Sequence, residues 1–372
     1  MIGWWELPGP SQFTARVAED LRSGRNVVLC LPDWLPEGLR EAVQARLPPS
    51  AGWVWDTIDL GQEPLAAPAD LIARRYLSDG QRARVRSARD LAVAEGFDFW
   101  LIWVDGVDSS QWPAWREFLV EFEAACRERP AYERSLLCVT VRGLSALDPP
   151  SAEVCLSVRL WQGEVEPLDM FIYCWALVRE KPWSELHRRL AASLLAAVSV
   201  WDPRVAERLA QQPLSTLLRP HPVLAEIARE RGWEDGEASD YPVLWALGMA
   251  ERQEGRWRIH SALLALHDPA GGLRSRLWSA EVSAVLPFLE EFRRTVVERH
   301  RALLRMPHST PDGRQITDCQ DLELQHLAYQ LARHPAVPES TRAQLRRLAN
   351  IRNRLAHLAV LEPAEIAYLV PD

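Results

Sequence analysis

Five short apolar runs in the first 165 residues constrain the fold more than any other feature. They span residues 26–31, 53–55, 99–104, 136–141 and 154–160, and each is short enough to be a buried strand. Helical periodicity fills the gaps, for example with Phe13, Val17 and Leu21 on one face. Strands that alternate with helices predict a parallel sheet covered on both faces.

Beyond residue 165 the strand-like runs stop and helical periods take over. We therefore expect a multidomain α/β plus all-α protein, since 372 residues are too many for one ordinary core. Its parts are an α/β domain at 1–165, a helical region at 166–268 and a helical bundle at 269–372. In the middle region, helices are followed by a strand, a glycine turn and a second strand at 248–260, an order that resembles a winged helix-turn-helix.

Polar residues end two of the expected strands. Asp105 follows five apolar residues, which is the pattern of a Walker B strand whose aspartate holds Mg²⁺, and Thr140 stands where many P-loop NTPases keep a polar sensor. The first strand, however, runs into residues 32–38, which contain no lysine and two acids. Because Lys181 is the only lysine, the chain contains no phosphate loop of the form GxxxxGK[ST].

In its layout, the stretch 1–165 resembles the P-loop AAA/STAND core of NTPases with the phosphate loop missing. The resemblance implies a pseudo-ATPase scaffold in which Asp105 and Thr140 are vestiges of a nucleotide site. We expect no cofactor, no metal and no ATP hydrolysis.

The C-terminal region contains the sequence Arg352-Asn353-Arg354-Leu355-Ala356-His357. Asn353 and His357 are four residues apart, so on a helix they share a face, and the long Arg352 side chain can reach the same space. Histidine can transfer protons near neutral pH, and arginine can stabilise a phosphorane. These residue types suit cleavage of RNA without a metal.

The motif resembles that of the HEPN family, as do residues 277–278, 286–290 and 321–324 on the helices before it. The resemblance implies a helical bundle that dimerises through residues 275–370, with Arg352, Asn353 and His357 as the catalytic set of a ribonuclease. Many HEPN domains cut nothing, and there the three side chains serve helix capping and packing.

The combination of parts resembles proteins of bacterial antiphage-defence islands. We expect a non-catalytic or regulatory interaction subunit that docks other defence proteins, and a HEPN endoribonuclease is the alternative. A second alternative is a winged-helix DNA-binding regulator, in which Arg252, Arg256 and Arg258 of the hairpin contact phosphates.

Bulk properties limit the partners. The net charge of −8 and the pI of about 5.7 disfavour a protein that coats nucleic acid, although a local RNA or DNA site stays open. The six cysteines lack metal-ligand spacing and are expected to be buried thiols. Residues 1–6 do not start a signal peptide and no apolar run is long enough to span a bilayer, so we expect a cytoplasmic protein without a membrane partner. The 17 tryptophans are expected mainly in the core.

Overall fold

The computed structural model describes residues 3–48, 52–63, 66–143, 149–234, 240–267, 271–311 and 313–369. The chain forms two compact units. We call Ile2–Asp169 with Asp235–His260 the α/β unit, and Met170–Glu234 with Ser261–Asp372 the helical unit.

The α/β unit is built on a five-stranded parallel sheet in the order β2-β3-β4-β1-β5. The strands are β1 (Asn26–Leu31), β2 (Val54–Asp59), β3 (Trp100–Val107), β4 (Leu136–Arg142) and β5 (Leu156–Leu160). Each overlaps a predicted apolar run, although β2 shares only residues 54 and 55 with its run, so the prediction of an α/β fold with a parallel sheet is confirmed. All six residues of β1 are buried, which explains why that run does not alternate.

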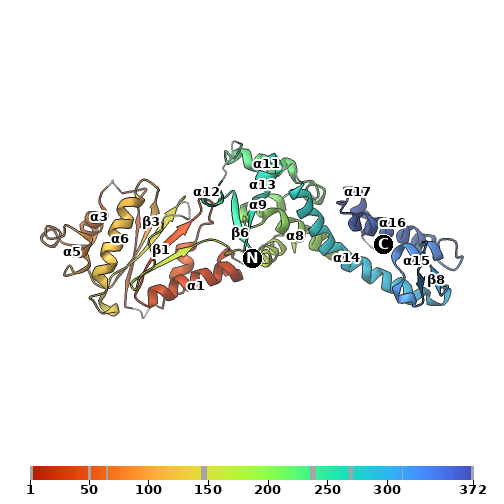
Figure 1. Ribbon diagram of the computed structural model, residues 1–372, viewed down its shortest axis with the longest axis horizontal. Helices are drawn as coiled ribbons and strands as arrows, with labels where there is room; N and C mark the ends of the chain where they lie inside the picture. The colour runs from red at the N-terminus through yellow and green to blue at the C-terminus, as the bar shows by residue number, and fades with distance from the viewer. Residues whose placement is uncertain are drawn as a thin grey trace. The chain divides into compact units, whose positions relative to one another are not determined.

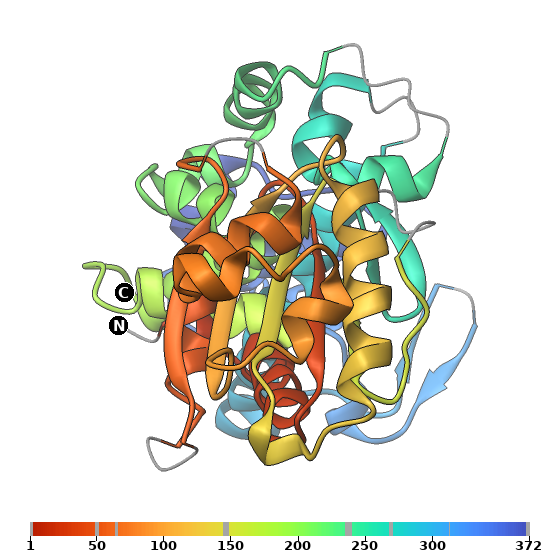
Figure 2. The same ribbon diagram turned by 90° about the vertical axis from the view of Figure 1, so that its left-hand side faces the viewer.

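Helices cover both faces of this sheet, and Figure 1 shows α3, α5 and α6 on one side and α1 on the other. Figure 2 shows the same sheet from the side on which α6 lies. The helices are η1 (Trp4–Glu6), α1 (Pro8–Arg22), α2 (Leu39–Gln44), α3 (Pro68–Tyr76), α4 (Asp79–Arg82), α5 (Ala88–Ala92), α6 (Trp112–Cys126) and η3 (Ala131–Glu133). The spacing of Leu39, Val43 and Leu47 predicts a helix that reaches residue 47. Helix α2 ends at Gln44, and Leu47 lies in the turn that follows it.

The expected winged-helix segment is divided between the two units. Helix α12 (Tyr241–Ala246) and the hairpin of β6 (Ala250–Gln253) and β7 (Arg256–Ile259) belong to the α/β unit, whereas α11 (His221–Glu230) belongs to the helical unit. The predicted domain boundary near residue 165 lies close to the division at 169–170. The predicted middle domain 166–268, by contrast, has residues in both units.

The helical unit is organised around one 29-residue helix, α14 (Gly272–His300), which packs along α8 (Glu185–Ser199) and against α15 and α16. The other helices are α9 (Pro203–Ala210), α10 (Leu214–Leu217), α13 (Ser261–His267), η4 (Arg301–Leu303), η5 (Cys319–Asp321), α15 (Leu324–Leu331), α16 (Glu339–Ala356), α17 (Pro363–Ile366) and η6 (Ala367–Leu369). Helix α7 (Pro167–Val178) contains the division between the units.

Several local predictions in this unit are wrong. The polar composition of residues 307–317 predicts a loop, but the stretch contains a short hairpin of β8 (His308–Ser309) and β9 (Gln315–Ile316). Ser340 is the residue type expected to cap the last helix, but Pro338 occupies the N-cap of α16 and Ser340 lies inside the first turn. Pro363 is expected to end the same helix, but α16 ends at Ala356 and Pro363 begins α17. Residues 268–270, in the loop 267–272 expected between the middle region and the C-terminal bundle, lie outside the described residues.

Burial agrees with the expected use of cysteine and tryptophan. All six cysteines are buried free thiols. Nine of the tryptophans are buried, among them Trp103, Trp161 and Trp245 with at most 1% of their surface exposed, so core packing is their main use. None of the described helices is long and apolar enough to cross a membrane.

Candidate functional site

A cleft of about 550 Å³ opens at the carboxyl edge of the parallel sheet. Its lining comes from the ends of β1, β3 and β4 and from the start of α2. The connections after β1 and β4 leave in opposite directions, since β2 lies at one edge of the sheet and β5 at the other. Such a reversal between neighbouring strands is the usual position of a ligand crevice in open α/β sheets.

Asp105 and Thr140 meet in this cleft. The Thr140 hydroxyl donates a hydrogen bond to Oδ1 of Asp105 at 2.5 Å. Thr140 is buried, whereas Asp105 is partly exposed at the end of β3. The structure thus brings together the two residues that the sequence placed at neighbouring strand ends.

The loop after β1, residues 32–38, takes a structural role. Trp34 and Leu35 are buried, and the Asp33 amide donates to the carbonyl of Ala246 in α12. A Cβ built on Gly248 would lie 2.3 Å from the Trp34 ring, so the ring packs directly on that backbone. The loop therefore holds the residues of α12 and the β6–β7 hairpin against the sheet at the place where a phosphate loop would lie.

Charges in the sheet-edge cleft are mixed. Arg40 forms an ion pair with Glu41 at 2.5 Å, and Glu37 lies beside them on the lining. Burial raises the pKa of Asp33, and the nearby Arg142 charge opposes that rise. An anionic ligand such as a polyphosphate would meet carboxylates on the wall formed by residues 37–41.

The three arginines of the hairpin do not share a face. Arg252 pairs with Trp257 across the hairpin, whereas Arg256 and Arg258 lie opposite Gln253 and Glu251. Since alternate residues of a strand point to opposite faces, Arg252 lies on one face and the other two arginines lie on the second.

The two arginines of that second face also differ. Arg258 is bound to Glu254 at 3.0 Å, which leaves Arg256 exposed. Glu251 and Gln253, their neighbours on the same face, are buried and bind backbone groups at Gly163 and Val165. This face of the hairpin is therefore largely used for packing within the α/β unit.

In the C-terminal motif, Arg352 faces the start of α15. Its guanidinium lies 3.1 Å from the carboxylate of Glu323. The two side chains line a cleft of about 380 Å³ between α14, η5 and α16, together with Glu290, Arg293 and Asp321. The arginine that the motif offers to phosphate is thus paired with one carboxylate, in a cleft that also contains Asp321 and the Arg293–Glu290 ion pair.

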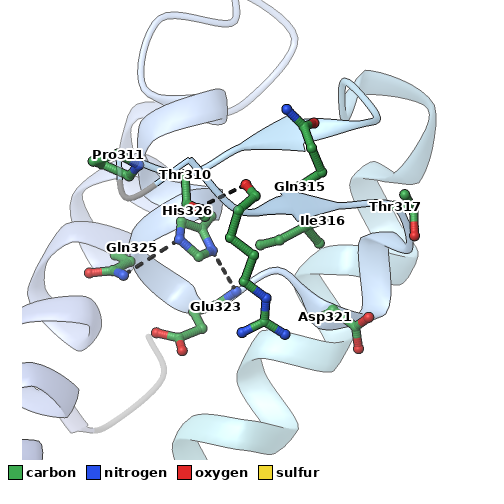
Figure 3. A pocket seen from close by; sticks show the side chains of 10 residues that line it. Thr310, Pro311, Gln315, Ile316, Thr317, Asp321, Glu323, Gln325 and His326 are labelled. Atoms are coloured by element: carbon green, nitrogen blue, oxygen red, sulfur yellow. Dashed lines mark hydrogen bonds between the residues drawn. The ribbon is translucent and has the colours of Figure 1, made fainter.

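A second cleft, of about 570 Å³, shares Asp321 and Glu323 with the first. Figure 3 shows His326, Glu323 and Asp321 around it, with Gln315 and Ile316 from the hairpin on the opposite wall. The Glu323 amide donates to Nδ1 of His326 at 3.2 Å. That bond places the proton of a neutral His326 ring on Nε2.

His357 lies at the end of α16, not within it. The amides of His357, Leu358 and Ala359 donate back to carbonyls of the last turn, which forms a Schellman-type C-cap. Leu358 occupies the left-handed position of that cap with φ of 58°, where glycine is usual. Trp278 of α14 donates from Nε1 to the carbonyl of Leu355 at 2.7 Å.

Backbone amides and Trp278 therefore perform the capping that the non-catalytic interpretation assigned to the motif side chains. The His357 ring is exposed. Within the described part of the chain, neither that ring nor the Asn353 side chain has a hydrogen-bond or ion-pair partner. No contact brings Arg352 and His357 of one chain together among the described residues.

Arg354, which lies between Arg352 and His357 in the sequence, contacts the segment that follows α16. It donates to the carbonyl of Val360 at 2.8 Å and forms ion pairs with Glu362 and Glu365. Beside it, Glu281 of α14 is fully buried and accepts the amide of Leu361 through Oε2 at 2.8 Å. Burial raises the pKa of Glu281 to about 7, and the Leu361 bond and the charges of Arg219 and Arg354 oppose the rise.

Sequence reasoning missed Glu281, Glu323 and His326. The one available signal for Glu281 is a carboxylate among the apolar residues Trp278, Val282 and Val285 of an amphipathic stripe. Of the described residues, no group of three or more His, Cys, Asp or Glu side chains is placed to hold a metal ion.

No family model matches the chain, and neither a curated protein nor a solved structure gives a significant match.

Proposed function

We propose that this chain is a non-catalytic interaction subunit of a bacterial defence system, and that its C-terminal bundle self-associates around Leu358. The proposal keeps the interpretation that the HEPN-like and pseudo-ATPase resemblances imply. The conformation and exposure of one residue support it best.

Leu358 has two features that are unfavourable in an isolated monomer, a strained backbone conformation and an exposed apolar side chain. It adopts a left-handed backbone conformation that costs a residue with a Cβ about 1 kcal/mol, and 62% of its surface is exposed. Its neighbours Ala356 and His357 are exposed as well. A strained, exposed leucine at a helix end is explained if a second copy of the bundle covers it.

The environment of Arg352 argues against catalysis as the main role. Its charge is paired with Glu323, and Asp321 and Glu290 line the same cleft. A phosphate approaching Arg352 would have to displace Glu323 and would meet the carboxylate of Asp321, while Glu290 is already paired with Arg293. The site therefore fits a structural ion pair better than a phosphate clamp.

Sedimentation of the full chain over a range of concentrations tests the self-association. We expect the wild type to form a dimer and Leu358→Gly to weaken it by at least tenfold, while Leu358→Gly unfolds at higher urea because glycine relieves the strain. Val154→Gly removes an equally exposed apolar side chain from the α/β unit and serves as the control. A wild type that remains a monomer, or a Leu358→Gly variant that associates normally, contradicts the proposal.

The ribonuclease remains a second candidate because the His357 ring is exposed and unused by the fold. If it is correct, Glu323→Gln should raise RNA cleavage in the presence of a chelator by freeing Arg352. Arg352→Ala and His357→Ala should abolish the cleavage. Equal activity in all four proteins, or none, excludes this candidate.

A further inference from the structure

One end of the helical bundle carries a group of arginines without ion-pair partners. Several other arginines of the bundle are neutralised, as Arg293 is by Glu290 and Arg342 is by Glu339. Among the described residues, the arginines near the end of α14 and just after α15 have no such partner. We call Arg299, Arg301, Arg305, Tyr329 and Arg333 the bundle tip.

Hydrogen bonds hold the two halves of the bundle tip together. The Gln330 side chain of α15 accepts the amide of Arg305 at 2.8 Å and donates to its carbonyl at 3.4 Å. At the end of α14, the charge of His334, which follows α15, acts on His300. Figure 1 shows α15 beside the end of α14.

The four arginines of the bundle tip are exposed, and within the described residues none has a side-chain hydrogen bond, ion pair or ring contact. Residues 294–305 and 329–334 contain one acid, Glu298, against five arginines. This local positive charge stands out in a chain whose net charge is −8.

The bundle tip also includes an exposed aromatic side chain. Tyr329 of α15 is 79% exposed, which is unusual for a ring of that size, and it precedes Gln330, whose side chain binds the backbone of Arg305. His308 of the hairpin lies between Tyr329 and His326, with ring centroids 6.5 Å and 5.1 Å away. Exposed rings between free cations are the features that bind single-stranded nucleic acid by stacking and phosphate contact.

We propose that the bundle tip binds single-stranded RNA, with Arg301, Arg305 and Arg333 on phosphates and Tyr329 stacked on a base. The site is separate from the Arg352–Glu323 cleft and requires no cleavage. The site also does not depend on self-association through Leu358. The bundle tip lies at the end of α14, whereas Trp278 near the start of α14 binds the carbonyl of Leu355, close to Leu358 in the chain.

Binding of a labelled, uncleavable 2′-O-methyl oligouridylate of about 12 nucleotides tests the proposal by fluorescence anisotropy. We expect Arg301→Ala/Arg305→Ala to weaken binding by about tenfold and to reduce the slope of log affinity against log salt by about 1.4, two contacts at about 0.7 each. Tyr329→Ala should weaken binding at least fivefold with little change in the slope, since stacking on a base contributes about 1 kcal/mol or more.

Arg74→Ala/Arg84→Ala is the matched control, because it removes from the α/β unit two exposed arginines that have no ion pair among the described residues. It should bind as the wild type does. Equal losses in both double variants would reduce the effect to net charge and overturn the proposal.

Two further outcomes would also overturn it. In the first, polyglutamate competes as strongly as unlabelled oligonucleotide and Tyr329→Ala has no effect on binding. This result would indicate an acidic protein partner instead of RNA. The second is unchanged affinity in Arg301→Ala/Arg305→Ala. Since the probe cannot be cleaved and association is measured separately, either result leaves the proposed function to its own test.

Discussion

The guanidinium of Arg352 lies 3.1 Å from the carboxylate of Glu323, at the shared wall of two clefts in the helical unit. The residue that the motif offers for phosphate binding is thus neutralised by an acid 29 positions earlier in the chain.

The first prediction compares two neighbouring arginines of the motif. Arg352→Ala should lower the free energy of unfolding by less than about 1 kcal/mol, because its ion pair is exposed to solvent. Arg354→Ala should cost about 1–2 kcal/mol, since it removes the partner of the Val360 carbonyl and of Glu365, while Glu362 keeps its ion pair with Arg219. Urea denaturation of both variants measures the difference, and a larger loss for Arg352→Ala would contradict it.

The second prediction concerns the loop after β1. Gly248→Ala should destabilise the protein by about 3 kcal/mol or more, because the new methyl group meets the buried Trp34 ring in addition to the strain at φ of 75°. Gly255→Ala has nearly the same φ but no neighbour within 4 Å, so it should cost only about 1 kcal/mol. Equal urea midpoints for the two variants would contradict the prediction that the Trp34 ring makes Gly248→Ala the more destabilising change.

The third prediction follows from Glu251, which is 1% exposed. Burial raises its pKa to about 8, despite hydrogen bonds from the amides of Arg252 and Gly163. A carboxyl group with a raised folded-state pKa contributes fully below its ordinary value of 4.5, and that stability is lost as the pH rises to 8. Glu251→Gln should therefore gain on the wild type between pH 5 and pH 9.

Urea midpoints at pH 5, 7 and 9 measure the effect of Glu251→Gln. Glu254→Gln alters an exposed acid of the same hairpin and should show no such trend. A constant difference between Glu251→Gln and the wild type at all three values would contradict the prediction.

The fourth prediction applies the same reasoning to Glu281, whose Oε1 is buried without a hydrogen-bond partner. Its pKa is raised to about 7, so the loss of stability should be complete at a lower pH than for Glu251. Glu281→Gln should gain on the wild type up to about pH 7.5 and then stay level. Exposed Glu291 on the same helix gives the control, Glu291→Gln, and a gain that continues to pH 9 would assign the effect to another group.

Local patterns predicted much of the framework. The runs in β1, β3 and β4 mark their strands because a strand buried on both faces must be largely apolar, and this requirement is visible in a few consecutive residues. The run at 53–55 marks only the start of β2, an edge strand that continues through Asp56 and Asp59. The runs in β3 and β4 placed Asp105 and Thr140 at neighbouring strand ends, where they form a hydrogen bond. The ends of α16 were not predicted, since Pro338 and Leu358 serve as caps in place of the residue types that usually do so.

The absence of a lysine-bearing phosphate loop and the presence of the Arg352–His357 motif are properties of the sequence alone. Whether these groups are available for chemistry depends on contacts between residues far apart in the chain. Trp34 meets Gly248, Arg352 meets Glu323 and Glu281 meets Leu361 only because helices and loops pack in one particular way. Periodicity describes which face of an element is buried, but the partner on the other side is selected by the packing of the whole unit.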